Sequence, residues 1–161
     1  ENAMKAAGAA ANGVVFPVRT ATVWGGDAAG MANVRAISRV SDQAGTAYRP
    51  VHYLAGVCAA MLMVEAMDTA AANNGTVDGV RIRDGFYARQ NWVPAGFEGV
   101  CEPSNFTAED HRGTLTVGLY RAVVSGDTTQ GSVDELMRAG TMRLDRVTSI
   151  TLDRRRDWLG W

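Results

Sequence analysis

The sequence is poor in the residues from which most metal sites and thiol chemistry are built. Cysteine occurs only at Cys58 and Cys101, histidine twice, and lysine only at Lys5. There is no CxxC pair and no cysteine–histidine cluster at zinc spacing, which argues against a structural metal. We therefore expect no metal and no cofactor. Two cysteines fit either one disulfide or two buried thiols.

Excess charge of either sign is also lacking. The 161 residues carry a formal net charge of −1, with a pI near 6.1, so we expect no nucleic-acid partner. The one tight basic run, residues 154–156, is interpreted as a solvated tail. A composition of 47% hydrophobic and 20% charged residues is typical of a soluble globular protein, and the length suits one domain.

Long hydrophobic runs are few. The longest, residues 53–64 (YLAGVCAAMLMV), meets Glu65 well short of the roughly 20 residues that a membrane span requires. We expect no spanning segment, and interpret this run as part of a deeply buried helix. No signal peptide is visible, and the opening ENAMKAAGAA resembles neither a natural start nor a secretion signal. We expect a fragment, or a mature chain cut from a longer one.

The order of local patterns alternates helix and strand, which indicates an α/β protein. Helices are expected at residues 3–11, 28–41 and 50–73, the last beginning at Pro50 and closed by Gly75. Short helices are expected after Asp78 and Ser132, which are both good N-caps. Strand-type runs occupy residues 13–18, 97–103, 113–126 and 141–152.

The stretch FTAEDHRGTL places Glu109, Asp110, His111 and Arg112 in a row, which are residue types that active sites use. In an extended segment neighbouring side chains point to opposite faces and cannot converge on one substrate. In a turn, Asp110 and Gly113 would be present because Asp and Gly favour turn conformations of the backbone. We favour the turn. An enzyme using His111 with Asp110 is the alternative, and it requires both side chains on one wall of a pocket.

The best polar and aromatic cluster lies near the start of the long helix, where Tyr48, Arg49, His52 and Tyr53 follow one another. A helix N-terminus favours neutral or anionic groups, so these residues either cap and pack locally or bind a ligand carboxylate. Trp24 lies in a glycine-rich loop, where it either packs back on the protein or covers a ligand. That loop lacks the lysine and spacing of a nucleotide site.

Taken in order, several segments resemble the periplasmic substrate-binding proteins of ABC transporters, of the leucine/isoleucine/valine-binding type. They are AAGAAANGVVFP, YRPVHYLAGVCAAMLMVEAM, VDGVRIRDGFYARQNWVPAGFEGV and PSNFTAEDHRGTLTVGLYRAV, with the ending LDRRRDWLGW. The resemblance covers nearly the whole chain, but it matches only the C-terminal part of that family. It implies part of a type I periplasmic-binding fold, with two lobes built from parallel sheets flanked by helices and incomplete in this chain. In the family the Glu109–Gly113 segment is a strand–turn–strand piece and not catalytic.

The same resemblance implies a division of the chain. Residues 1–46 would form the end of the second lobe, residues 47–112 the last part of the first lobe, and residues 113–161 a return to the second lobe with a C-terminal tail. The protein would be periplasmic, its signal peptide outside this chain, and would deliver its ligand to an ABC permease in the membrane. Since so partial a fold leaves apolar surface open, we expect it to associate with the missing part or with a second, swapped copy.

The function implied is binding of an amino acid, or a related small carboxylic or aromatic acid, in a cleft between the lobes, and not catalysis. From this chain we expect the ligand to meet Arg19, Thr20, Trp24, Tyr48, His52 and Tyr53. Arg19 or His52 would face a carboxylate and an aromatic side chain would cover the ligand. The alternative function is a ligand-sensing domain of a receptor or regulator with the same fold.

The exported setting that the resemblance implies also bears on the cysteines. Both fall in the first-lobe part, where an oxidising compartment permits a disulfide. We expect Cys58 and Cys101 to be paired or close enough to pair.

Overall fold

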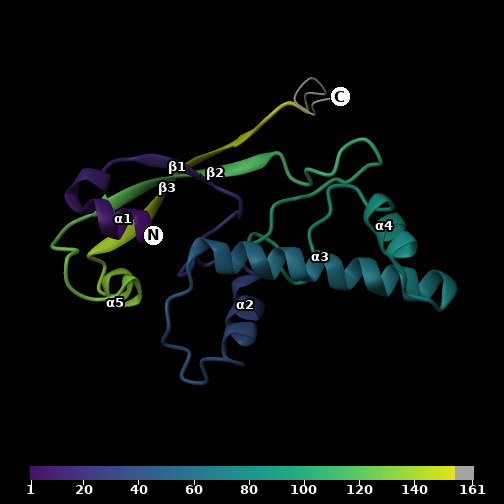
Figure 1. The fold of residues 1–161 in the computed structure, drawn as a ribbon, viewed down its shortest axis with the longest axis horizontal. Coiled ribbons are helices and arrows are strands. Elements are labelled where there is room, and N and C mark those ends of the chain that lie inside the picture. The colour runs from purple at the N-terminus through teal and green to yellow at the C-terminus, as the bar shows by residue number, and fades with distance from the viewer. Residues whose placement is uncertain (155–161) are drawn as a thin grey trace.

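The computed structural model describes residues 1–154 of the chain, and it mixes short and long helices with one small sheet (Figure 1). A mixed helix-and-strand protein is therefore confirmed. The elements follow one another as α1 (Asn2–Ala7), the 3-10 helix η1 (Gly8–Ala11), β1 (Val15–Val18), α2 (Met31–Ser38), α3 (Val51–Asn74), α4 (Gly79–Tyr87), β2 (Thr116–Val124), α5 (Val133–Arg138) and β3 (Met142–Thr151).

The sheet corrects the expected architecture. It has three strands in the order β1-β2-β3, and both pairings are antiparallel. Val124 at the end of β2 pairs with Met142 at the start of β3, because α5 and its loops return the chain to the same end of the sheet. A parallel neighbour would need a crossover to the opposite end. The parallel sheets of a type I periplasmic-binding fold are thus not present among the described residues.

One group of elements, here called the sheet unit, comprises residues 1–18 and 114–152. Its core lies where α1, η1 and α5 cover the sheet, and is formed by Met4, Ala11, Ala122, Val124, Leu136 and Met142. Ser132 begins α5 with a capping box: the backbone N–H of Glu135 binds the Ser132 hydroxyl, and the Glu135 carboxylate accepts from Ser132 N. This reciprocal pair satisfies two N–H groups that the helix leaves free.

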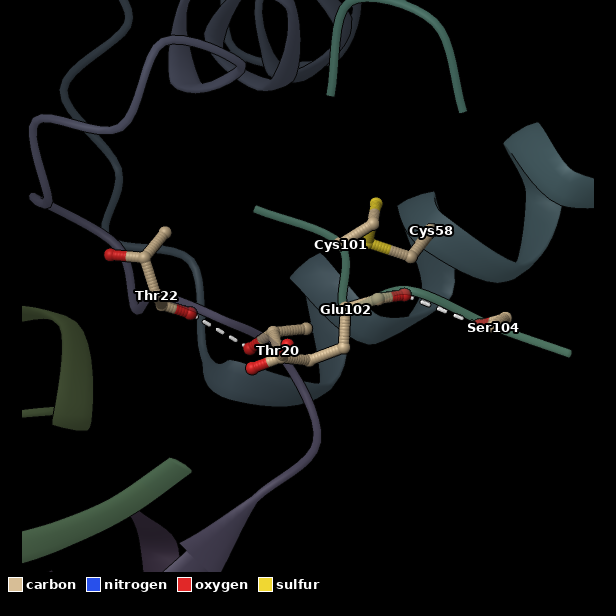
Figure 2. The surroundings of a disulfide bond; sticks show 6 residues. All are labelled: Thr20, Thr22, Cys58, Cys101, Glu102 and Ser104. Atoms are coloured by element: carbon tan, nitrogen blue, oxygen red, sulfur yellow. Dashed lines mark hydrogen bonds between the residues drawn. A yellow bond between two sulfur atoms is a disulfide. The ribbon is translucent and has the colours of Figure 1, made fainter. Parts of the chain in front are cut away.

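The second group, the helical unit, comprises residues 21–112 and is built along α3. Its core joins α2, the first half of α3 and an irregular loop, and is formed by Met31, Val34, Leu54, Val57, Cys58, Phe97, Val100 and Cys101. Cys58 on α3 and Cys101 in the loop form a disulfide with a Cα separation of 5.5 Å, as expected (Figure 2). The predicted strand over residues 97–103 is wrong, because this loop turns repeatedly and its backbone pairs with no strand.

Farther along α3, the carboxylate of Glu65 holds the loop that follows α4. It accepts hydrogen bonds from Trp92 Nε1 at 2.7 Å and Ala95 N at 2.6 Å, and it forms an ion pair with Arg89. Burial alone would raise the pKa of Glu65, but the bonds from Ala95, Trp92 and Arg89 outweigh it and lower the pKa. Glu65 is therefore ionised and structural.

The expected deep burial of α3 is wrong. Buried positions follow one stripe, Leu54, Val57, Cys58, Ala66 and Ala70, because the helix has neighbours on one side only. Met63, Val64 and Met67 on the other side are each about two-fifths exposed (44%, 44% and 39%). An uncovered apolar face is what association with a missing part or a second copy would require. That association stays a prediction.

The expectation about membrane spans also needs correction. Within the described residues, one helix, over Val51–Asn73, is long and apolar enough by length and composition to cross a membrane, although 28% of the tested window is buried inside the protein. The apolar run identified in the sequence ends at Glu65, but α3 continues through Glu65 to Asn74. Since Glu65 binds the loop that follows α4, its charge is satisfied within the protein.

One expected lobe boundary falls inside the helical unit, and the other falls at a passage between the two units. The boundary expected near residue 46 falls inside the helical unit, because Met31 and Val34 of α2 share a core with Leu54 of α3. The other expected boundary, near residue 113, lies where the chain passes from the loop to β2. The lobe assignments themselves stay a prediction, and the part covering residues 155–161 lies outside the described residues.

Alanine substitutions at two glycines test how α3 packs. A Cβ on Gly85 in α4 would lie 2.7 Å from the carbonyl oxygen of Ala66, so Gly85→Ala should force α4 away from α3. We expect it to lower the free energy of unfolding by about 1–3 kcal/mol. Gly56, inside α3, has open space around its Cβ position. Gly56→Ala should instead raise stability by about 0.5–1 kcal/mol, since alanine favours helix.

Urea denaturation followed by circular dichroism measures both changes. If Gly85→Ala were as stable as the parent protein, the close approach of α4 to α3 would be contradicted.

Candidate ligand-binding site

The start of α3 lies between the two units, and a polar hollow forms there. We call it the Glu1 hollow. It has a volume of about 440 Å³ and is lined by Glu1, Asn2, Ala3, Tyr48, Pro50, His52, Val133 and Asp134. The lining comes from α1, the segment before α3, the first turn of α3, and α5. Segments far apart in the sequence thus meet at one helix N-terminus.

The Glu1 carboxylate organises this hollow. Its Oε1 accepts a hydrogen bond from the Tyr48 hydroxyl at 2.7 Å and another from the backbone N–H of Val51 at 3.0 Å. The second bond caps α3, which has no side-chain cap of its own at Pro50. Burial and the bond to Glu1 raise the pKa of Tyr48, so this hydroxyl stays protonated and donates.

Asp134 also lines the hollow and connects α5 to the same segment. Its Oδ1 accepts from Tyr48 N at 2.5 Å, and its Oδ2 pairs with Arg138 at 2.7 Å. The bond from Tyr48 N and the bond from Arg138 lower the pKa of Asp134. The hollow therefore carries an ionised aspartate beside Glu1. His52 is exposed at its edge.

A second, apolar hollow adjoins the first. It has a volume of about 460 Å³ and shares Glu1, Ala3 and His52 with the Glu1 hollow. Its remaining walls are almost wholly hydrocarbon, formed by Met4, Ala7, Ala10, Ala11, Val14, Phe16, Pro17, Val51 and Ala122. We call it the apolar hollow. A polar and an apolar compartment therefore meet at Glu1 and His52.

The other expected ligand residues do not gather there. Tyr53 packs against the core of the helical unit, with the Arg49 guanidinium 5.1 Å from its ring centroid. Trp24 packs against the same core, so of its two expected roles the structure shows packing on the protein. Thr20 is buried and donates from its hydroxyl to the carbonyl of Thr22 at 2.7 Å (Figure 2).

Arg19 is exposed and lines a different cavity. Of the six expected residues, only Tyr48 and His52 share the Glu1 hollow. The sequence interpretation missed Glu1 and Asp134. No local signal marks these two acids as neighbours of Tyr48, because they lie 47 and 86 residues from it.

The acid–histidine–arginine stretch forms a turn in which each group has a structural partner. Asp110 is buried and accepts from Arg112 Nε at 2.9 Å, Arg112 Nη2 at 2.7 Å and Arg112 N at 3.0 Å. Arg154 also binds this carboxylate, so the expected solvated tail does not hold for that residue. His111 is exposed and shares a 2.6 Å hydrogen bond with the Tyr87 hydroxyl. Asp110 thus binds Arg112 and Arg154, and His111 is hydrogen-bonded to Tyr87.

Metal-binding geometry is not found in residues 1–154, where no group of three or more His, Cys, Asp or Glu side chains could hold an ion. Comparisons with protein-family models, curated proteins and solved structures find no match for this chain. The resemblance to periplasmic binding proteins therefore rests on the sequence motifs alone.

Asp110 provides a pH-dependent test of the turn. The hydrogen bonds from Arg112, together with the charge of Arg154, hold the pKa of Asp110 far below its usual value despite burial. A lowered folded-state pKa stabilises the protein above the unfolded pKa of about 3.9, and this stabilisation is lost as the pH falls further. Asp110→Asn should therefore cost about 1–2 kcal/mol at pH 7, and the difference should shrink below about pH 4.

Chemical denaturation across pH 3–7 measures the effect. Asp145→Asn, in an exposed pair with Arg143 on β3, is the control and should change stability by less than about 0.5 kcal/mol. A pH-independent loss in Asp110→Asn would contradict the ionic role.

Proposed function

We propose that this chain is the C-terminal part of a solute-binding component of an ABC importer, and that it binds an apolar amino acid or a related small carboxylic acid. The observation that supports the ligand class is the junction of the Glu1 hollow with the apolar hollow at Glu1, Ala3 and His52. An apolar amino acid needs such a junction, because its charged groups and its side chain require opposite environments.

The ammonium group would bind the Glu1 carboxylate. Both protein hydrogen bonds to Glu1 go to Oε1, so Oε2 is without a partner among the described residues. A charge-assisted bond from an ammonium to Oε2 would be strong in this partly enclosed place. Asp134 adds a second negative charge to the lining of the hollow.

The carboxylate would lie at the first turn of α3. A helix N-terminus carries partial positive charge and favours anions, and α3 runs for 24 residues. The exposed His52 ring is available there to donate a hydrogen bond. The side chain of the amino acid would then enter the apolar hollow, between Met4, Val14 and Phe16.

Transport and location complete the proposal. The Cys58–Cys101 disulfide supports an exported, periplasmic protein, because such bonds persist in oxidising compartments. Delivery to a membrane permease follows from the sequence resemblance. No catalytic step is part of the proposal.

Isothermal titration with leucine tests the ligand class. 4-Methylpentanoate and 3-methylbutylamine, which each lack one of the two charged groups, should bind more weakly than leucine. Glu1→Gln keeps an oxygen for Tyr48 and Val51 but removes the negative charge, so it should weaken leucine binding about tenfold, which is ~1.4 kcal/mol.

Glu109→Gln, an exposed acid in the distant turn, is the matched control and should leave affinity unchanged. Equal affinity of the parent protein and Glu1→Gln for leucine would contradict the assigned role of Glu1. If neither leucine nor either analogue bound, the proposed ligand class would be wrong.

A further inference from the structure

A third cavity, separate from the two hollows at the start of α3, lies where the chain passes between the units. We call it the Arg19 cavity. Its volume is about 570 Å³, and it shares no lining residue with the Glu1 hollow or the apolar hollow. Arg19 borders it at the passage from β1 into the helical unit, and Gly113 at the return passage into β2.

The cavity has a hydrocarbon wall on each unit. Ala55, Ala59 and Leu62 contribute from successive turns of α3, beside the Cys58–Cys101 disulfide. Leu115 and Val117 contribute from the start of β2. An apolar body placed between these walls would contact both units at once.

Arg19, Glu102 and Arg112 also line the cavity, and the two arginines differ in whether they have an ionic partner. The Arg112 guanidinium is engaged by Asp110 through two side-chain hydrogen bonds. Arg19, by contrast, makes no side-chain hydrogen bond or ion pair with any residue from 1 to 154, and it is exposed. An unpaired guanidinium beside an apolar wall suits a carboxylate ligand, which it can bind through two parallel hydrogen bonds.

Glu102 is the one acid in the described lining of this cavity. It follows Cys101 directly, and its side chain is directed toward the segment that carries Thr20 (Figure 2). The backbone bond from Ala21 N to the Val100 carbonyl, at 2.9 Å, holds these segments together. Burial raises the pKa of Glu102, against the opposing charge of Arg146 on β3. Its negative charge would disfavour an anionic ligand nearby.

We propose that the Arg19 cavity is a second binding site, which takes a small monocarboxylate with an apolar body, its carboxylate on Arg19 and its body between α3 and the start of β2. This goes beyond the amino-acid site at Glu1, since a ligand here needs no ammonium group. Because the site is lined by both units at their connecting segments, its ligand also holds those units in their present arrangement.

Titration of the 161-residue chain with 3-phenylpropanoate, followed by calorimetry and by backbone amide NMR shifts, tests the site. We expect shifts around Arg19, Glu102 and Thr114. The neutral 3-phenylpropanamide should bind at least about tenfold more weakly, since it cannot pair with the guanidinium.

Two charge variants should change affinity in opposite directions. Arg19→Gln should weaken 3-phenylpropanoate binding about tenfold, and Glu102→Gln should strengthen it roughly threefold by removing repulsion. Arg121→Gln, an exposed arginine on β2 that is outside the cavity lining, is the control and should have no effect. Ala59→Phe should abolish binding by filling the cavity without altering its charge.

The proposal is overturned if the amide binds as well as the acid, if Arg19→Gln binds as tightly as the parent protein, or if the shifts cluster at His52. Leucine binding and its dependence on Glu1 are measured on the same protein, so either site can fail while the other stands. Thermal unfolding midpoints equal to that of the parent protein will show that the variants are folded.

Discussion

The disulfide between Cys58 and Cys101 is the constraint on which the helical unit depends. It joins the second turn of α3 to a loop that has no strand or helix of its own. Such a loop has few backbone bonds to resist unfolding, and a covalent link that closes 43 residues removes much of the freedom of the unfolded chain. With the loop held, Phe97 and Val100 complete the core beside Leu54, and Val100 receives the backbone bond from Ala21. Both cysteines also line the Arg19 cavity.

Ionised carboxylates make the other long-range connections. Glu65 binds the loop after α4, Asp110 binds both Arg112 and Arg154, and Asp134 binds the segment before α3. Each of these acids accepts at least two hydrogen bonds, which is what a shielded charge requires. Glu1 differs, because its two bonds go to one oxygen. That difference leaves Oε2 of Glu1 without a partner among the described residues, which is why the amino-acid site is proposed there.

The position of α3 explains why cavities line its first half. A helix of 24 residues that packs through one stripe must leave other faces to loops, solvent or ligands. Residues of the first half of α3 line the Glu1 hollow, the apolar hollow and the Arg19 cavity, each together with residues of the sheet unit. The two units are joined by short connecting segments and by the hydrogen bonds that Tyr48 and Val51 donate to Glu1 and Asp134, so groups that contact both units influence how they are arranged. Binding between two such units is the mode of action that the sequence resemblance implied.

Local chemistry in the sequence determined where α3, α4 and α5 begin and where α3 ends. Pro50 and Gly75 bound α3, Asp78 caps α4 and Ser132 caps α5, because a cap acts on N–H or C=O groups within four residues of itself. The same local pattern placed Tyr48 and His52 at the start of α3, and so identified half of the candidate site. Only the tertiary structure decided the rest: the antiparallel pairing of β1 and β3 with β2, the open face of α3, and the meeting of Glu1 and Asp134 at Tyr48. These features depend on which distant segments pack together, and the local spacing of residues does not specify that packing.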